Sequence, residues 1–269
     1  MAESSRPPLV MIHGAFCGAW AFDEFRKPFA RQHKIFAPTL RYHDYGRDAP
    51  KELGRTSLLD YAADLGKLIA GLDDKPVLVG HSMGGLLAQM LAARGLARAC
   101  VLLAPSAPWG VLPSTMFEIA SAQALLFSSG DYRGSVIPPS YQIAAAHSLD
   151  KLDAVARRDV YARFVPESGQ ATFEIMNWSF DFRRAGHVRA HDVTCPVLCL
   201  VGADDKINPP STVSRIASRY QGRARVEVLK DHSHWLIGEP GWERVAARAS
   251  EWLDSALLEE KHADAENIE

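Results

Sequence analysis

The chain has 269 residues, of which 47% are hydrophobic and 23% are charged, and its formal net charge is −2. These values are typical of a globular protein with a sizeable core, and they argue against long disordered regions. A small negative charge with scattered arginines gives no basic surface for a phosphate backbone, so nucleic acid is not an expected partner.

The start of the chain, Met1–Pro8, is polar and lacks the apolar stretch of a secretory signal. No apolar run reaches the roughly 18 residues needed to cross a bilayer, so we expect a cytoplasmic protein without a membrane partner. The sequence contains four cysteines, too few for a disulfide scaffold and without the paired spacing of a metal site. Buried free thiols and no bound metal are therefore expected for Cys17, Cys100, Cys195 and Cys199.

Short apolar runs alternate with helical patterns along the chain, and runs of this kind suit a parallel sheet that is buried on both faces. The predicted strands are Leu9–Ile12, Ile35–Ala37, Val77–Val79, Cys100–Leu103, Val197–Val201 and Val226–Leu229. The predicted helices between and after them are Ser57–Ala70, Gly85–Arg94 and Trp242–Leu257. This alternation predicts an α/β fold.

The alternation stops after Ala104 and resumes at Val197, and helical spacing recurs within the gap over Met116–Phe127, Leu152–Phe164 and Phe173–Phe180. Ligands bind at the carboxyl edge of open α/β sheets, so we expect this insertion to cover that edge as a helical cap. The predicted organisation is a core of residues 1–106 and 191–258, a cap of residues 107–190, and an acidic tail without regular structure at 259–269.

One tight turn carries the strongest chemical signal. Gly80-His81-Ser82-Met83-Gly84 matches the pattern G-x-S-x-G, and it lies between the predicted strand Val77–Val79 and a helix. Such a turn strains the backbone and needs glycines where chains pass closely. Ser82 is therefore the predicted nucleophile, and the Met83 amide at the helix start is expected to bind a developing oxyanion.

A serine hydroxyl is a weak nucleophile, so a histidine must take its proton and an acid must orient that histidine. In folds with this turn, the acid and the histidine follow the serine in the chain, each after a strand. Val197–Val201 is followed by Asp204 and Asp205, and Val226–Leu229 is followed by His232 and His234. Each loop thus offers two candidates.

The turn at Ser82, the segment VGADDKINPP and the segment HWLIGEP together resemble the catalytic blocks of the α/β-hydrolase superfamily. The resemblance implies a mostly parallel central sheet with helices on both faces and a helical cap. The family's acid usually stands three residues after the strand-end glycine and four before a proline, which selects Asp205 over Asp204. Its histidine usually precedes Glu-Pro by five residues, which selects His234 over His232. The family's other acid position is empty here, because Ala104–Pro108 contains no carboxylate.

The segment HGAFCGAW, which follows the predicted strand Leu9–Ile12, resembles the oxyanion loop of plant-type methyl esterases and hydroxynitrile lyases. The resemblance implies that the Ala15 amide is the second oxyanion donor, with Phe16 close by and His13 holding the loop. Segment 37–46 departs from the family, in which an Asp and a Gly-x-Gly-x-Ser turn are common.

Serine at the turn argues against dehalogenases and epoxide hydrolases, which resemble this chain but carry aspartate there. Gly14 and Trp235 stand where the lyases have threonine and lysine, which disfavours a lyase. We therefore expect an enzyme that hydrolyses a carboxylic ester or lactone through an acyl-enzyme on Ser82, without a cofactor. Carbon–carbon hydrolases and cofactor-free perhydrolases share the triad and stay open as alternatives, as does a non-catalytic protein that binds a small ligand on the same fold.

The substrate pocket is expected to be largely apolar, since ligand pockets are mostly lined by hydrophobic and aromatic side chains. An apolar pocket favours a small or medium, uncharged acyl substrate. Aromatics of the cap should contribute to it, and the residues expected to line it are Phe16, Trp20, Trp109 and Trp235. The sequence leaves the natural substrate and the oligomeric state open.

Overall fold

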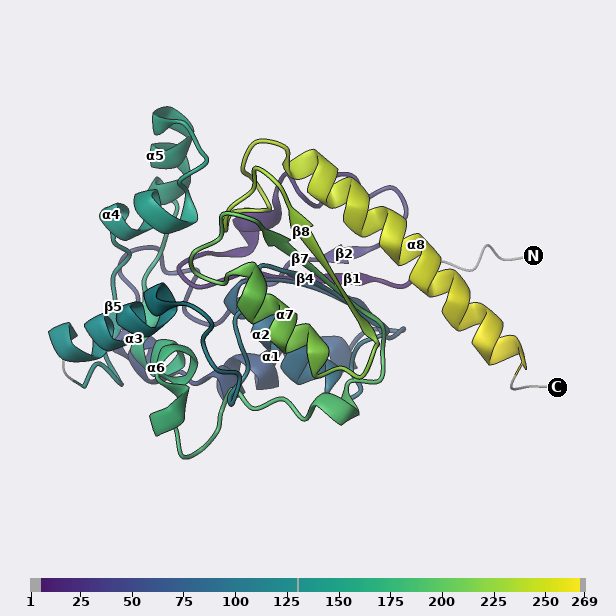
Figure 1. The fold of residues 1–269 in the computed structure, drawn as a ribbon, viewed down its shortest axis with the longest axis horizontal. Coiled ribbons are helices and arrows are strands. Elements are labelled where there is room, and N and C mark those ends of the chain that lie inside the picture. Colours follow the sequence, from purple (N-terminus) through teal and green to yellow (C-terminus); the bar gives the residue numbers. More distant parts are fainter. Residues whose placement is uncertain (1–5, 130, 267–269) are drawn as a thin grey trace.

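The computed structural model describes residues 6–129 and 131–266. Its centre is a six-stranded sheet in the order β2-β1-β3-β4-β7-β8, in which every neighbouring pair is parallel (Figure 1). The strands are β1 (Leu9–Ile12), β2 (Ile35–Phe36), β3 (Val77–His81), β4 (Ala99–Leu103), β7 (Val197–Gly202) and β8 (Ala224–Leu229). The predicted parallel sheet is confirmed, and its four central strands are buried along their whole length.

Helices cover both faces of the sheet, as predicted. The helices α1 (Leu58–Ala70), α2 (Met83–Ala92) and α7 (Pro210–Ser218) lie on one side in Figure 1, and α8 (Trp242–Glu266) lies on the other. Because successive side chains of a strand point to opposite faces, β1 contributes to two cores. Val10 and Ile12 pack with the residues of α1, α2 and α7, whereas Leu9 and Met11 pack with those of α8.

The end of α8 differs from the prediction of an irregular tail at 259–269. The helix continues to Glu266, and residues 267–269 lie outside the described part of the chain. The segment consists largely of Glu, Lys and Ala, which favour helix, and it contains neither Gly nor Pro to end one. Intrinsic helix propensity therefore outweighs the lack of an apolar stripe.

The segment between β4 and β7 forms a group of helices beyond one end of the sheet (Figure 1). They are α3 (Met116–Ser129), α4 (Tyr141–Ile143), α5 (Ala154–Ala162) and α6 (Gly169–Met176), followed by a short 3-10 helix at Trp178–Phe180. A small antiparallel pair, β5 (Val136–Ile137) with β6 (Glu167–Ser168), was not predicted, because two-residue strands leave no periodicity to read. We call residues 107–190 the insertion.

The remaining helical turns are short and lie in the connections. They are the 3-10 helices Ala19–Phe22, Lys51–Arg55 and Ala190–Asp192 and the π-helical turn Ala144–Ser148. No helix within the described ranges is long and apolar enough to cross a membrane.

Candidate active site

Ser82 occupies the turn between β3 and α2, where its backbone has φ 53° and ψ −120°. This conformation is strained for a residue with a side chain, and it persists because the surrounding structure holds it. A Cβ on Gly84 would lie 2.0 Å from the carbonyl oxygen of Ile12, and one on Gly80 would lie 2.3 Å from that of Gly84. Both glycines are thus required by close backbone contact, which is the reason the G-x-S-x-G pattern predicts this turn.

Ser82, His234 and Asp205 form one chain of hydrogen bonds at the carboxyl edge of the sheet. The Oγ of Ser82 lies 3.0 Å from Nε2 of His234, and Nδ1 of His234 lies 2.9 Å from Oδ2 of Asp205. Since the carboxylate accepts the Nδ1–H, Nε2 is left to accept the proton of the serine hydroxyl. Asp205 is buried, and its Oδ1 accepts the amides of Ile207 at 2.8 Å and Asn208 at 2.9 Å.

The two alternative candidates lie outside this chain of hydrogen bonds. The side chain of Asp204 is 54% exposed and its carboxylate is 2.5 Å from Nζ of Lys151. His232 is buried, with Nδ1 2.9 Å from Oε1 of Glu239, which also accepts the amide of Ser233. Within each pair, the residue that the family pattern selects is therefore the one that reaches toward Ser82.

The loop after β1 passes directly beside the serine. A Cβ on Gly14 would lie 2.9 Å from the Cβ of Ser82. His13 is fully buried, and burial lowers its pKa to about 3, so its ring is neutral. Its Nε2 accepts the amide of Leu40 at 3.0 Å, and its Nδ1–H therefore donates to the carbonyl of Gly14 at 2.8 Å.

The two predicted oxyanion donors are chain neighbours of residues at the turn, since Ala15 follows Gly14 and Met83 follows Ser82. Met83 is the first residue of α2, whose initial N–H groups have no partner inside the helix. Within the described ranges, neither amide donates to a backbone carbonyl in a turn or loop. Binding of an oxyanion by these two amides stays a prediction.

A model of the alpha/beta hydrolase family matches residues 9–248, which is most of the chain. The chain belongs to the alpha/beta hydrolase family. It is 26% identical to epoxide hydrolase 3 of Xenopus tropicalis over 254 residues, covering 87% of this chain and 68% of that protein. A shorter match to salicylic acid-binding protein 2 of Nicotiana tabacum is 38% identical over 81 residues, 29% of this chain and 30% of the relative.

Solved structures show the same fold at low identity. A monoacylglycerol lipase of Paleococcus ferrophilus has a TM-score of 0.66 at 21% identity, covering 93% of this chain and 96% of the lipase. A methylesterase of Arabidopsis has a TM-score of 0.69 at 14% identity, covering 93% of this chain and 99% of the methylesterase. These structures show the fold, whereas the match to the family model shows that the protein is a hydrolase.

The aromatic residues predicted for the pocket of this hydrolase fall into two groups. Trp20, Trp235 and Phe164 pack together with ring centroids 6.0 to 6.2 Å apart, and Trp235 also meets the ring of His81 edge-on at 5.5 Å. Trp235 is only 4% exposed, so its described contacts are those of a core residue that supports the loop of His234. A role of these side chains in substrate binding stays a prediction.

Trp109 lies in a separate cluster in the insertion. Its ring packs against Trp178 at 5.3 Å, and the guanidinium of Arg184 lies over it at 4.5 Å. Phe16 is half-buried in the loop after β1 and has a positive φ of 63°. The four predicted pocket residues thus do not form one described aromatic cluster.

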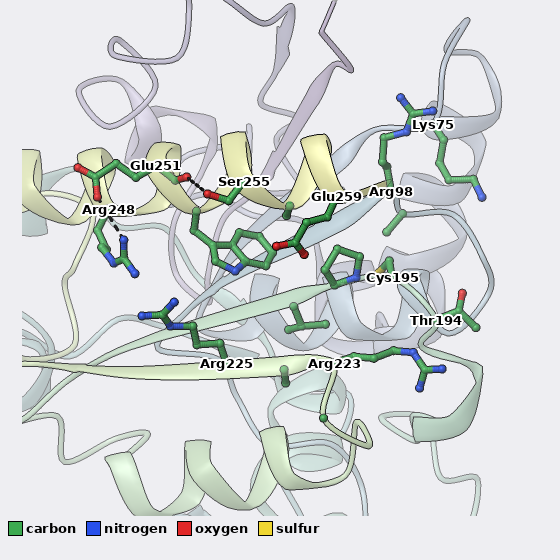
Figure 2. A pocket seen from close by; sticks show the side chains of 17 residues that line it. Lys75, Arg98, Thr194, Cys195, Arg223, Arg225, Arg248, Glu251, Ser255 and Glu259 are labelled. Atoms are coloured by element: carbon green, nitrogen blue, oxygen red, sulfur yellow. Dashed lines mark hydrogen bonds and ion pairs between the residues drawn. The ribbon is translucent and has the colours of Figure 1, made fainter. Parts of the chain in front are cut away.

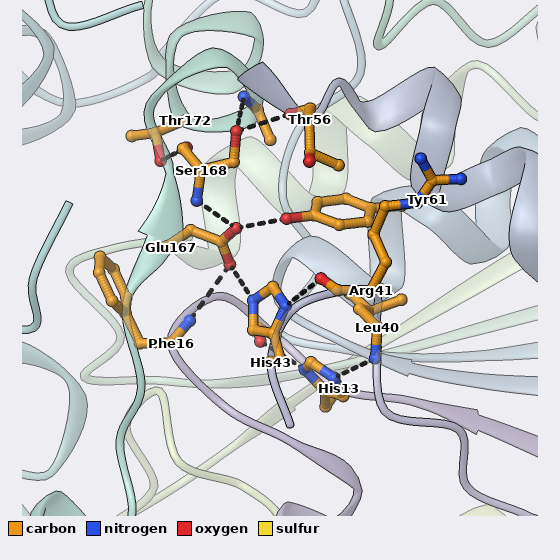
Figure 3. A network of polar contacts seen from close by, with 12 residues as sticks. His13, Phe16, Leu40, Arg41, His43, Thr56, Tyr61, Glu167, Ser168 and Thr172 are labelled. Carbon is orange, nitrogen blue, oxygen red and sulfur yellow. Dashed lines mark hydrogen bonds and ion pairs between the residues drawn. The ribbon is translucent and has the colours of Figure 1, made fainter. Parts of the chain in front are cut away.

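The insertion also contributes a buried carboxylate that the sequence patterns do not predict. Glu167 has no exposed surface, and its carboxylate accepts four hydrogen bonds (Figure 3). The donors are Nε2 of His43 at 3.0 Å, the hydroxyl of Tyr61 at 2.9 Å, and the amides of Ser168 at 2.7 Å and Phe16 at 3.3 Å. A single glutamate within a helical insertion carries no pattern that predicts such contacts.

His43, from the segment that departs from the family, is the counter-charge of Glu167. Its Nδ1 lies 3.0 Å from the carbonyl of Arg41 and its Nε2 faces the carboxylate, so both nitrogens donate and the ring is protonated. Burial by itself disfavours both charges. Their mutual attraction and hydrogen bond nevertheless raise the pKa of His43 and lower the pKa of Glu167.

A groove of about 710 Å³ lies at the opposite edge of the sheet, where β7 and β8 begin (Figure 2). It is lined by α8 and by several lysine and arginine side chains, and two of the arginines form ion pairs with glutamates. Arg248 binds Glu227 at 2.6 Å and Glu251 at 3.2 Å, and Arg225 binds Glu227 at 2.8 Å. None of the residues of the candidate active site lines this groove. No cluster suited to a metal ion occurs among the described residues.

Proposed function

We propose that this hydrolase cleaves a carboxylic ester or lactone through an acyl-enzyme on Ser82. The observation that carries the proposal is the hydrogen-bonded chain from Ser82 through His234 to buried Asp205, with contacts of 3.0 and 2.9 Å. In the first step, Oγ of Ser82 attacks the carbonyl carbon while Nε2 of His234 takes the hydroxyl proton. The carboxylate of Asp205 stabilises the resulting imidazolium and holds the ring in place.

The negative charge that develops on the carbonyl oxygen would be bound by the amides of Ala15 and Met83. Donors that point in advance at the oxyanion lower the barrier, because no reorganisation is needed when the charge forms. His234 then gives its proton to the alkoxide oxygen as the carbon–oxygen bond breaks, which leaves the acyl group on Ser82. A water molecule, deprotonated by His234, hydrolyses this acyl-enzyme and restores the serine.

The nucleophile itself favours acyl chemistry over the epoxide opening named for the Xenopus tropicalis relative. A carboxylate that opens an epoxide forms an ester, which water can hydrolyse, whereas a serine would form an ether that water does not cleave. Position 82 is a serine. The substrate is proposed to be small or medium and uncharged, with its acyl group against Phe16 and the aromatic side chains of the insertion.

The direct test compares hydrolysis of p-nitrophenyl acetate by the wild type and by Ser82→Ala. We expect kcat to fall by about 10⁴-fold or more, the size of loss seen when a triad nucleophile is removed. Ser233→Ala is a matched control, since its buried hydroxyl has no hydrogen-bond partner among the described residues, and we expect it to keep the wild-type rate. Equal rates for wild type and Ser82→Ala would refute the proposal.

The alternatives are separated by the choice of substrate. Simple esters, lactones and β-diketones, assayed under the same conditions, distinguish ester hydrolysis from carbon–carbon cleavage. Added hydrogen peroxide tests for a perhydrolase, because peracid would then form from the acyl-enzyme. The proposal is supported if kcat/KM is higher for esters or lactones than for β-diketones. Ligand binding without turnover of any of these substrates would instead support a binding protein.

A further inference from the structure

Phe16, the residue after the proposed oxyanion donor Ala15, is held on both sides by one short segment of the insertion. Its amide donates to Oε2 of Glu167 at 3.3 Å, and its carbonyl accepts the amide of Val165 at 2.9 Å. The φ of Phe16 is 63°, a left-handed conformation that costs a bulky residue about 1–2 kcal/mol. Contacts from outside the loop are therefore needed to maintain it.

These contacts bear on the direction of the Ala15 amide. Each peptide unit is planar, so the carbonyl of Gly14 and the N–H of Ala15 move together, as do the carbonyl of Ala15 and the N–H of Phe16. His13 holds the first plane through the carbonyl of Gly14 at 2.8 Å, and Glu167 holds the second through the amide of Phe16. Both planes that flank Ala15 are thus fixed by buried side chains.

The carboxylate of Glu167 is held in turn from several elements. Tyr61 of α1 donates to Oε1, His43 donates to Oε2, and the amide of Ser168 donates to Oε1 (Figure 3). An isolated carboxylate near the site would oppose the formation of an oxyanion, because like charges repel strongly in a buried environment. The protonated ring of His43 cancels this charge, so the pair can support the loop without that penalty.

We propose that Glu167 is a positioning residue, which reaches from the insertion to the loop after β1 and holds the peptide plane that follows Ala15. Together with His13, which holds the plane that carries the Ala15 N–H, it keeps that amide directed toward the oxyanion. This inference rests on the proposed function, because it assigns a purpose to the Ala15 amide. It also makes the oxyanion site dependent on the contact between the insertion and the core. Glu167 acts through the backbone of Phe16 and touches no reacting atom.

The test compares Glu167→Gln with Glu174→Gln. Glu174 is a second buried carboxylate of the insertion, which accepts the Ser57 hydroxyl and the Leu58 amide at 2.8 Å and does not contact the loop after β1. Both variants lose a buried charge, so both are expected to lower the thermal midpoint. At a temperature well below both midpoints, we expect kcat to fall by about 10- to 100-fold in Glu167→Gln only, with KM within about threefold of wild type.

A trifluoromethyl ketone gives the second readout, because the serine adduct carries a negative oxygen as the transition state does. Its inhibition constant should rise in Glu167→Gln in proportion to the fall in kcat/KM, and it should be unchanged in Glu174→Gln. If Glu167→Gln does not fold, Tyr61→Phe carries the same test, since it removes only one donor to the carboxylate. We expect a smaller fall in kcat for this variant, again without a matching change in KM.

Two outcomes would overturn the inference. In one, Glu167→Gln, or Tyr61→Phe in its place, is less stable but keeps the wild-type kcat and inhibition constant. In the other, Glu174→Gln loses kcat and inhibitor affinity to the same extent, which would indicate a general structural effect. Failure of the proposed function itself would appear separately, as hydrolysis by Ser82→Ala at the wild-type rate.

Discussion

Asp205 and His234 are 29 residues apart in the chain, and Oδ2 of Asp205 lies 2.9 Å from Nδ1 of His234. The neighbouring Asp204 points to solvent and binds Lys151 instead. Asp205 can therefore orient the base, whereas Asp204 joins two surface segments through its ion pair.

Replacing each of the two aspartates by asparagine tests this assignment. Asp205→Asn should lower kcat by about 10⁴-fold, because an amide facing Nδ1 favours the wrong tautomer of the histidine. Asp204→Asn removes only an exposed ion pair, worth about 0–1 kcal/mol, and should leave kcat within about twofold. Steady-state hydrolysis of p-nitrophenyl acetate measures both, and the reverse order of effects would contradict the assignment.

Gly84→Ala should destabilise the fold severely. The added Cβ would lie 2.0 Å from the carbonyl oxygen of Ile12, so the turn at Ser82 or β1 would have to move. We expect a loss of about 3 kcal/mol or more in the free energy of unfolding, measured with urea.

Gly66→Ala is the matched control for this variant, because Gly66 lies within α1 and its nearest contact would be an ordinary 3.8 Å from Leu96. Alanine favours helix over glycine, so this variant should gain about 0.5–1 kcal/mol. Similar effects of the two substitutions would show that close contact at position 84 is not the cause.

The stability of the hydrolase should fall as the pH is lowered from about 6.5. Burial lowers the pKa of His13 and of His81 to about 3, from an ordinary value of 6.5. Below pH 6.5 the unfolded chain therefore takes up two protons that the folded state excludes, which favours unfolding. Each histidine can contribute up to about 1.4 kcal/mol per pH unit, and the loss continues toward pH 3.

The pair of His43 and Glu167 affects other parts of the pH range. The pKa of His43 is raised, so its contribution is complete below 6.5 and is lost only as the pH rises through the raised value. The pKa of Glu167 is lowered, so its contribution is present above 4.5 and is lost as the pH falls through the lowered value. The free energy of unfolding, measured with urea at pH 7.5, 6.5, 5.5 and 4.5, reports the sum of these contributions. A gain in stability from pH 6.5 to pH 5.5 would refute the expected fall. The slope should be smaller in His81→Gln.

The four cysteines should react slowly with a thiol reagent in the native state. All are free and buried, as the sequence predicts, and burial raises the pKa of Cys199 to about 12 and also raises the pKa of Cys17. The thiolate is the reactive form, so both access and ionisation are suppressed. Dithionitrobenzoate should modify little of the native protein and all four thiols in denaturant. Rapid modification of the native protein would contradict the described burial.

Much of the architecture follows from local patterns in the sequence. The apolar runs became the strands of the parallel sheet, and Gly80 and Gly84 marked the turn at Ser82, because burial on two faces and close backbone contact both restrict residue type locally. The end of α8 departs from the prediction, because the helix propensity of its Glu, Lys and Ala residues outweighs the effect of its polar composition as far as Glu266.

The sequence by itself determined the class of fold, the turn at Ser82 and the two loops that hold the other candidates, because each depends on residues close together in the chain. Only the tertiary structure decided that Asp205 is buried against His234 while Asp204 is exposed. It alone brought Glu167 to Phe16 across 151 residues and to His43 across 124. Such contacts depend on how the insertion packs on the core, and a lone buried ion pair leaves no periodicity in the sequence by which it could be predicted.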